Sequence, residues 1–206
     1  MKKMMLIAII CLAMLSLISI SPAAEAQVLK SYEGNLTEKV MANQINYTTL
    51  VRYLGVPGLA TAEVTKFTAP KSGYKLTRVN ILGYDGYNGS AESIPMQRII
   101  ALEVRDSKFN LLYKYADTQV PYTNFLLNLT VPTLLSLELP SVPVSGEFYI
   151  CFFDRGAVAV GSEVQNKSTN TSFVFNEAEA ALGPASLPIS QTETVPVNWI
   201  MSVVGS

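Results

Sequence analysis

Three glutamates on expected strands have the chemistry that glycoside hydrolysis requires. Glu103, Glu138 and Glu147 could supply the two carboxyl groups that flank a glycosidic bond, one as acid and one as nucleophile or base. Their spacing matches no glycosidase motif, and glutamates on the polar side of a strand commonly face solvent. A secreted glycosidase or polysaccharide-modifying enzyme is therefore the alternative hypothesis, and a non-enzymatic protein is the preferred one.

The composition excludes the commonest catalytic and metal-binding machinery. The chain has no histidine and only two cysteines, Cys11 and Cys151. Ser-His-Asp and Cys-His arrangements cannot be built without histidine, and zinc sites need histidine or several cysteines. No glycine-rich phosphate-binding or dinucleotide-binding motif is present. No cofactor is expected, apart from the calcium ion considered below.

Two loops combine the side chains that bind sugars. Tyrosine rings stack on the apolar faces of sugars, while planar polar groups hydrogen-bond the hydroxyls at the rim. Asp-Gly and Asn-Gly pairs are also ordinary turn signals, so plain connecting loops are the alternative. The candidate residues are Tyr84, Asp85, Tyr87 and Asn88 in the loop 83–92, and Tyr115, Asp117, Gln119 and Tyr122 in the loop 115–124.

The first of these loops also contains oxygen donors of the kind that calcium prefers. They are Asp85, Asn88, Ser90 and Glu92. The four residues follow no calcium-binding motif, so a calcium site here is a hypothesis that rests on donor type alone.

Residues 1–26 have the pattern of a secretory signal peptide. Two lysines precede an apolar run over residues 4–20, and Ala-Glu-Ala at 24–26 fits the small-x-small rule for cleavage before Gln27. Residues 27–206 would then form a single domain, secreted or on the extracellular surface. An uncleaved anchor is the alternative, because the apolar run is nearly long enough to span a thin bilayer.

Charge and sequons indicate the kind of partner to expect. The formal net charge is -1 and no basic patch stands out, so nucleic acid is not an expected partner. Asn-x-Ser/Thr sequons exceed what chance pairing predicts, which favours a glycoprotein whose partner is a glycan or a surface protein. The sequons begin at Asn35, Asn46, Asn88, Asn128, Asn166 and Asn170. The oligomeric state is left open.

The elements that must position these residues are short strands. Apolar and polar residues alternate with a period of two over residues 100–105 and 111–116, which predicts a hairpin, and again over 135–139 and 197–203. Pro140 is expected to end its strand. Short strands, Gly/Pro turns and no long helix predict an all-β protein, a β-sandwich with at most one or two short helices.

Weaker patterns complete this outline. The alternation of the segment 61–68 slips near Lys66-Phe67, which suggests a bulge. Short helices are expected over residues 38–43 and 176–181, the latter capped by Asn176. Further strands are expected at Val28–Glu33, Thr49–Leu54, Thr61–Thr68, Tyr74–Leu82 and Ser172–Phe175.

The segments KFTAPKSGYKLTRVNILGY, VPVSGEFYICFFD and VNWIMSVVG occur in an order that resembles secreted jelly-roll modules, the lectin-like and carbohydrate-binding β-sandwiches of surface proteins. The resemblance covers most of residues 60–204 and implies that the last strand returns beside the first. It also implies glycan binding, although such modules include structural proteins and enzymes.

Two residues that resemble reactive or ligand-binding groups are expected in the core. The strand around Cys151 is apolar on both faces, so the thiol is expected to be buried and inert. Trp199 alternates with Val197 and Met201, which favours a core position over a ligand platform. This closing strand, over residues 197–203, is expected to pair with an early strand near Val28–Tyr32.

Overall fold

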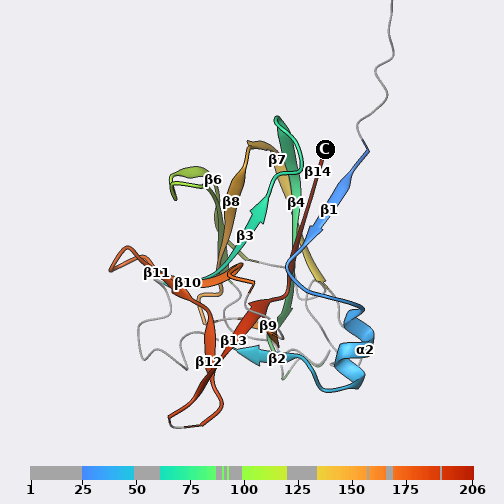
Figure 1. Cartoon of the computed structure of the whole chain (residues 1–206), viewed down its shortest axis with the longest axis vertical. Helices are drawn as coiled ribbons and strands as arrows, with labels where there is room; N and C mark the ends of the chain where they lie inside the picture. The colour runs from blue at the N-terminus through green and yellow to red at the C-terminus, as the bar shows by residue number, and fades with distance from the viewer. Residues whose placement is uncertain are drawn as a thin grey trace, which may run out of the picture.

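The computed structural model describes residues 25–48, 61–86, 90, 92, 99–119, 134–156, 158–165, 169–190 and 192–206, except for the side chains of 116–119. It contains the helix α2 (Leu36–Met41) and fourteen strands (Figure 1). In chain order the strands are β1 (Gln27–Lys30), β2 (Asn46–Thr48), β3 (Thr61–Thr68), β4 (Tyr74–Tyr84), β5 (Ile99–Asp106), β6 (Leu111–Gln119), β7 (Leu134–Val144), β8 (Glu147–Phe153), β9 (Ala159–Val164), β10 (Ser172–Asn176), β11 (Ala181–Pro184), β12 (Ser186–Pro188), β13 (Thr194–Trp199) and β14 (Met201–Gly205).

The strands form two antiparallel sheets that pack face to face, as the sequence predicts for a β-sandwich. The first sheet has the order β1-β14-β4-β9-β13-β12, with β7 paired to β4 and β2 paired to β9. The second has the order β11-β10-β3-β8-β5-β6. Strand β8 lies between β3 and β5, which confirms its expected central position.

The two ends of the sandwich differ in how their strands are connected. Tight turns join β3 to β4, β5 to β6 and β7 to β8, and these define the turn end, at the top of Figure 1. The same strands point their other termini to the opposite end, near β2 and β9. This loop end is marked by Thr61, Tyr84, Ile99, Gln119 and Phe153.

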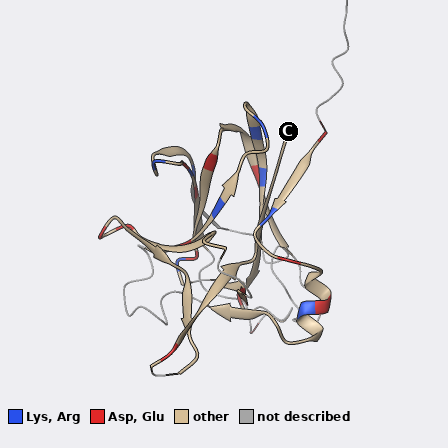
Figure 2. Ribbon diagram, viewed as in Figure 1, with Lys and Arg blue, Asp and Glu red and all other residues tan. Residues whose placement is uncertain are grey.

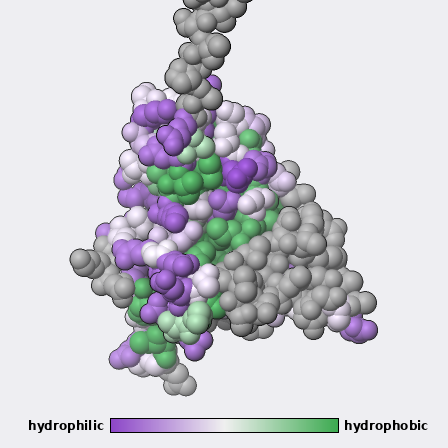
Figure 3. Space-filling model, turned by 90° about the vertical axis from the view of Figure 1, so that its right-hand side faces the viewer, coloured by the Kyte–Doolittle hydropathy of each residue, from purple (hydrophilic) through white to green (hydrophobic). Residues whose placement is uncertain are grey.

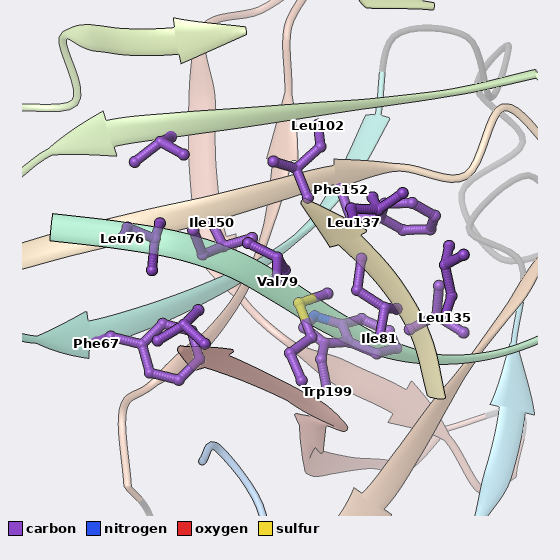
Figure 4. Close-up of a cluster of buried hydrophobic side chains, with 14 of the residues drawn as sticks. Phe67, Leu76, Val79, Ile81, Leu102, Leu135, Leu137, Ile150, Phe152 and Trp199 are labelled. Carbon is purple, nitrogen blue, oxygen red and sulfur yellow. The ribbon is translucent and has the colours of Figure 1, made fainter. Parts of the chain in front are cut away.

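The main core fills the space between the sheets. Side chains of β4, β7, β13 and β14 meet those of β3, β5 and β8 (Figure 4). Trp199 is fully buried there, and its Nε1 donates a hydrogen bond to the carbonyl of Phe173 at 2.8 Å. The core position expected for Trp199 is thus confirmed.

Two expected pairings are confirmed by the register of the strands. Strands β5 and β6 form the predicted hairpin, with Val104 opposite Tyr113. The last strand lies beside the first, because Val203 of β14 pairs with Leu29 of β1. The expected helix near residues 38–43 is α2, whose N-cap Asn35 accepts a hydrogen bond from the backbone N–H of Thr37.

Two other local expectations are wrong. Strand β7 does not end at Pro140 but continues to Val144, because it pairs only with β4 and its register shifts there, so the missing N–H is tolerated. Residues 176–181 form no helix. They make the turn between β10 and β11, where Asn176 accepts a hydrogen bond from the Ala178 N–H and Ala180 has φ 51°.

The bulge expected near Lys66-Phe67 is also absent, because β3 keeps one register with β8 from Glu63 to Thr68. The alternation slips because the polar residues Thr61, Glu63 and Thr65 share the core-facing side of β3 with Phe67. Thr65 is fully buried and its hydroxyl contacts Met201 Sδ at 3.4 Å.

A second, smaller apolar cluster covers the outer face of the second sheet. It includes Cys151, which is fully buried between Val64 and Glu103. Burial, partly opposed by Arg105, raises the pKa of the Cys151 thiol to about 12. The burial of Cys151 predicted from the two-sided apolar strand is confirmed, and its inertness stays a prediction.

Charged and hydrophobic side chains are spread thinly over the surface. Figure 2 shows lysine and arginine interspersed with aspartate and glutamate along the described ribbon. The side that carries β1 and α2 shows hydrophobic areas broken by hydrophilic ones (Figure 3), and Val28, Met41 and Val164 are exposed in β1, α2 and β9. Among the described residues, none forms a helix long and apolar enough to cross a membrane.

Candidate functional site

The two expected loops are shorter than predicted, because residues 83–84 belong to β4 and residues 115–119 belong to β6, but both strands end at the same end of the sandwich. Strand β4 of the first sheet ends at Tyr84, and β6 of the second ends at Gln119, opposite Ile99. Both positions belong to the loop end. Tyr87, Asn88 and Tyr122 lie outside the described residues, as do the side chains of Asp117 and Gln119.

The two described tyrosines of this set have different surroundings. Tyr84 is half-buried, and its ring lies edge-on against the ring of Tyr47, with centroids 6.0 Å apart. Tyr115 stands opposite Leu102 and packs, partly buried, against the main core. Tyr84 is thus the better placed of the two to contact a ligand.

A polar pocket of about 200 Å³ lies beside this tyrosine pair, where α2 meets the first sheet. Its lining residues are Lys39, Asn43, Gln44, Asn46, Glu163 and Val164. The pocket offers three carboxamides, one ammonium and one carboxylate, and carboxamides both donate and accept hydrogen bonds. This donor and acceptor set suits a polyhydroxylated ligand.

Two contacts to one carboxylate hold α2 in place over the sheet. Glu163 of β9 forms an ion pair with Lys39 of α2, and it also accepts a hydrogen bond from the backbone N–H of Glu33 at 3.2 Å. Because Glu163 is buried, the pair fixes the helix and the pocket wall together.

Tyr47 connects the pocket to Tyr84. Tyr47 follows Asn46 on β2 and stands opposite Gly161 of β9. Gly161 and Glu163 are two residues apart on β9, so the side chains of Tyr47 and Glu163 leave the same face of the sheet. Gly161 is required there, since a Cβ would come within 2.8 Å of the Leu82 side chain. Burial raises the pKa of Tyr47 to about 12, which keeps its hydroxyl neutral.

The three glutamates with catalytic potential are not brought together. Each lies in a separate ion pair, and Glu138 belongs to the first sheet while Glu103 and Glu147 belong to the second. Glu103 binds Arg105 at 2.6 Å and Lys114 at 3.3 Å, Glu138 binds Arg78 at 2.6 Å, and Glu147 binds Lys66 at 3.0 Å.

The oxygen donors of the first loop are described only in part. Asp85 is half-buried, and Glu92 is exposed. A hydrogen bond from its own backbone N–H and one from Ser90 lower the pKa of Glu92. Within the described part of the chain, no group of three or more His, Cys, Asp or Glu side chains could hold a metal ion.

Three of the six sequons begin at described asparagines. Asn35, Asn46 and Asn170 are all exposed, whereas Asn88, Asn128 and Asn166 lie outside the described residues. Asn46 also lines the polar pocket, so a glycan attached there would begin at the pocket itself.

A buried carboxyl pair at the loop end is not foreseen by the sequence patterns. Glu63 and Asp154 are both fully buried, and β3 directs Glu63 toward the space between the sheets. Burial first, and the nearby Asp154 charge second, raise the pKa of Glu63 well above its usual range. The only signal in the sequence was the slip in the alternation of β3.

No hydrogen-bond donor among the described residues reaches either carboxylate oxygen of Glu63. Glu63 and Asp154 can share a hydrogen bond only if one of them keeps a proton, because two carboxylates are both acceptors. The raised pKa of Glu63 makes it the protonated partner.

Comparisons with known proteins place the chain in no known family. No family model matches it, and searches of curated proteins and of solved structures found no significant match.

Proposed function

We propose that the protein is a non-enzymatic extracellular or cell-surface β-sandwich that binds glycans at its loop end. The contact surface is the polar pocket together with the Tyr47–Tyr84 pair. The observation that carries the proposal is a pocket lined by Asn43, Gln44 and Asn46 that adjoins a pair of tyrosine rings, because Tyr47 follows Asn46 on β2 and its ring contacts that of Tyr84. Sugars need such a combination of planar polar groups and a flat apolar surface.

Several features of the loop end support binding rather than bond cleavage. Glu103, Glu138 and Glu147 are engaged in separate ion pairs and are divided between the two sheets, whereas a glycosidase needs two carboxyl groups that face each other across the scissile bond. Strand β4, which carries Tyr84, and strand β6, which carries Tyr115, both end at the loop end of the sandwich.

Glycosylation at the Asn46 sequon would interfere with a binding measurement at the pocket. A glycan on Asn46 would compete for the pocket with any external sugar, so binding is best measured on protein that carries no glycans. The sequence 27–206, produced without glycosylation, is applied to a glycan array, and a positive glycan is then titrated by calorimetry.

Substitutions in the pocket and in the tyrosine pair test the surface. Tyr84→Ala and Gln44→Ala should each weaken binding about 5- to 100-fold, roughly 1–3 kcal/mol, with the fold intact. Tyr149→Ala is the matched control, since Tyr149 is also half-buried but packs between Phe109 and Phe173 on the outer face of the second sheet. An equal loss in the control, or no glycan bound by the parent protein, would refute the proposal.

A further inference from the structure

We propose that Thr61, Glu63 and Asp154 form a binding site for a hard cation, calcium in the first instance, inside the loop end of the sandwich. This site is separate from the glycan surface and from the oxygen donors of the loop 83–92. It is built from the strands that form the middle of the second sheet.

The three side chains are brought together by strand register. Thr61 and Glu63 are two residues apart on β3, so both point from the same face. Glu63 stands opposite Phe152 of β8, and continuing this register by two residues places Asp154 beside Thr61. Phe152 and Phe67 on this face belong to the main core, so all three oxygen-bearing side chains point between the sheets.

Burial leaves these oxygens without water. Thr61 is 1% exposed, and Glu63 and Asp154 are 0% exposed. The Thr61 hydroxyl and both Glu63 carboxylate oxygens have no hydrogen-bond partner among the described residues. Burying a polar group without a partner costs roughly 1–3 kcal/mol on protein scales, so a ligand that contacts these three atoms would stabilise the folded protein.

A shared proton would satisfy only part of this cluster. A proton between Glu63 and Asp154 would leave the second Glu63 oxygen and the Thr61 hydroxyl still without partners. A cation bound by both Glu63 oxygens, the Thr61 hydroxyl and a carboxylate oxygen of Asp154 would satisfy all of them. The Oδ1 atom of Asp154 also accepts a hydrogen bond from the Gly156 N–H at 2.7 Å.

The donor set selects the kind of cation. All four donors are oxygens, three of them from two carboxyl groups, which suits Ca²⁺ rather than zinc or copper. Calcium also tolerates irregular geometry, as expected where ligands come from one strand, β3, and from the turn that follows its neighbour β8. The two negative charges match its charge of two.

Thermal unfolding of the mature chain with added CaCl₂ tests the site. After dialysis against a chelator, saturating calcium at pH 7.5 should raise the melting temperature by roughly 5–10 °C when it is present at 100 times its Kd. Glu63→Gln should lower calcium affinity at least tenfold by calorimetry, and Thr61→Val should lower it severalfold. Glu138→Gln, a surface glutamate in the other sheet, is the control and should bind calcium like the parent.

The outcomes separate this site from a calcium site elsewhere in the molecule. No calcium-induced shift in the parent protein overturns the proposal, and so does a shift that Glu63→Gln retains. A shift abolished by Asp85→Asn but kept in Thr61→Val would assign the ion to the loop 83–92 and also overturn it. If Glu63→Gln does not fold, Thr61→Val alone decides, because this nearly isosteric change removes one ligand and no charge.

Discussion

The turn end and the loop end of the sandwich are built from the same strands with opposite chemistry. At the turn end, β3 and β8 place Phe67 and Phe148 together, with ring centroids 5.8 Å apart. At the loop end, the same faces of these strands carry Glu63 and, just beyond β8, Asp154. Apolar packing is what a core requires, whereas a buried carboxyl pair lowers stability unless something binds it. We therefore assign stability to the turn end and the proposed binding functions to the loop end.

The largest effect is expected at the turn end. Phe148→Ala removes a fully buried ring from the main core and should destabilise the protein by about 3–5 kcal/mol. Denaturant unfolding followed by Trp199 fluorescence measures this loss. A cost below about 1 kcal/mol would show that the turn end is not the packed anchor that its burial indicates.

A smaller effect is expected on the outer face of the same strand. Cys151→Ser should cost about 1–3 kcal/mol, because it buries a hydroxyl among apolar groups. With a thiol pKa of about 12, the native protein should also resist a thiol reagent at pH 8 until denaturant is added. Rapid labelling of the native protein would contradict this burial.

The buried carboxyl group of Glu63 at the loop end should make the protein less stable as pH rises, whereas carboxyl groups usually make proteins more stable. The folded state keeps the proton on Glu63 at pH values where the unfolded chain, with a pKa near 4.5, has lost it. Without added cation, stability should therefore fall as pH rises above about 4.5, by at most about 1.4 kcal/mol per pH unit for this group. Glu63→Gln should remove that part of the slope, which chemical unfolding between pH 4 and 8 measures.

The smallest effect is expected at the surface of the edge strand β7. Glu138→Gln breaks an ion pair with Arg78 in which both side chains are largely exposed, at 66% and 45%. The free energy of unfolding should change by less than about 0.5 kcal/mol. A larger loss would mean that the charges on this sheet matter more than its packing.

Regular alternation made much of the fold predictable. The pattern over residues 100–116 predicted the β5–β6 hairpin, and the two-sided apolar stretch around Cys151 predicted a central strand. Trp199 was placed in the core for the same reason. In these segments the hydrophobic residues face the core, so the alternation of apolar and polar residues predicts both the strand and its buried face.

The sequence predictions failed where contacts between distant residues determine the local structure. Asn176 looked like a helix cap, but an asparagine side chain caps a turn equally well, and pairing of β10 with β11 settled the outcome. Glu63 was not foreseen as a site residue because a charged side chain on a strand normally faces solvent. Only the register with β8 shows that it points inward. The pocket at Lys39 and Glu163 joins residues far apart in sequence, which no local pattern reports.

The pairing of β1 with β14 has a consequence for how the chain reaches its folded state. The Ser31 hydroxyl donates to the carbonyl of Met201 across 170 residues, so the first strand has no partner until the last has been synthesised. Loop closure over such a distance is slow. A chain that stops before Met201 would expose two unpaired edges, on β1 and β4, each a template for aggregation. Synthesis of β14 is thus the step that commits the molecule to a closed sheet.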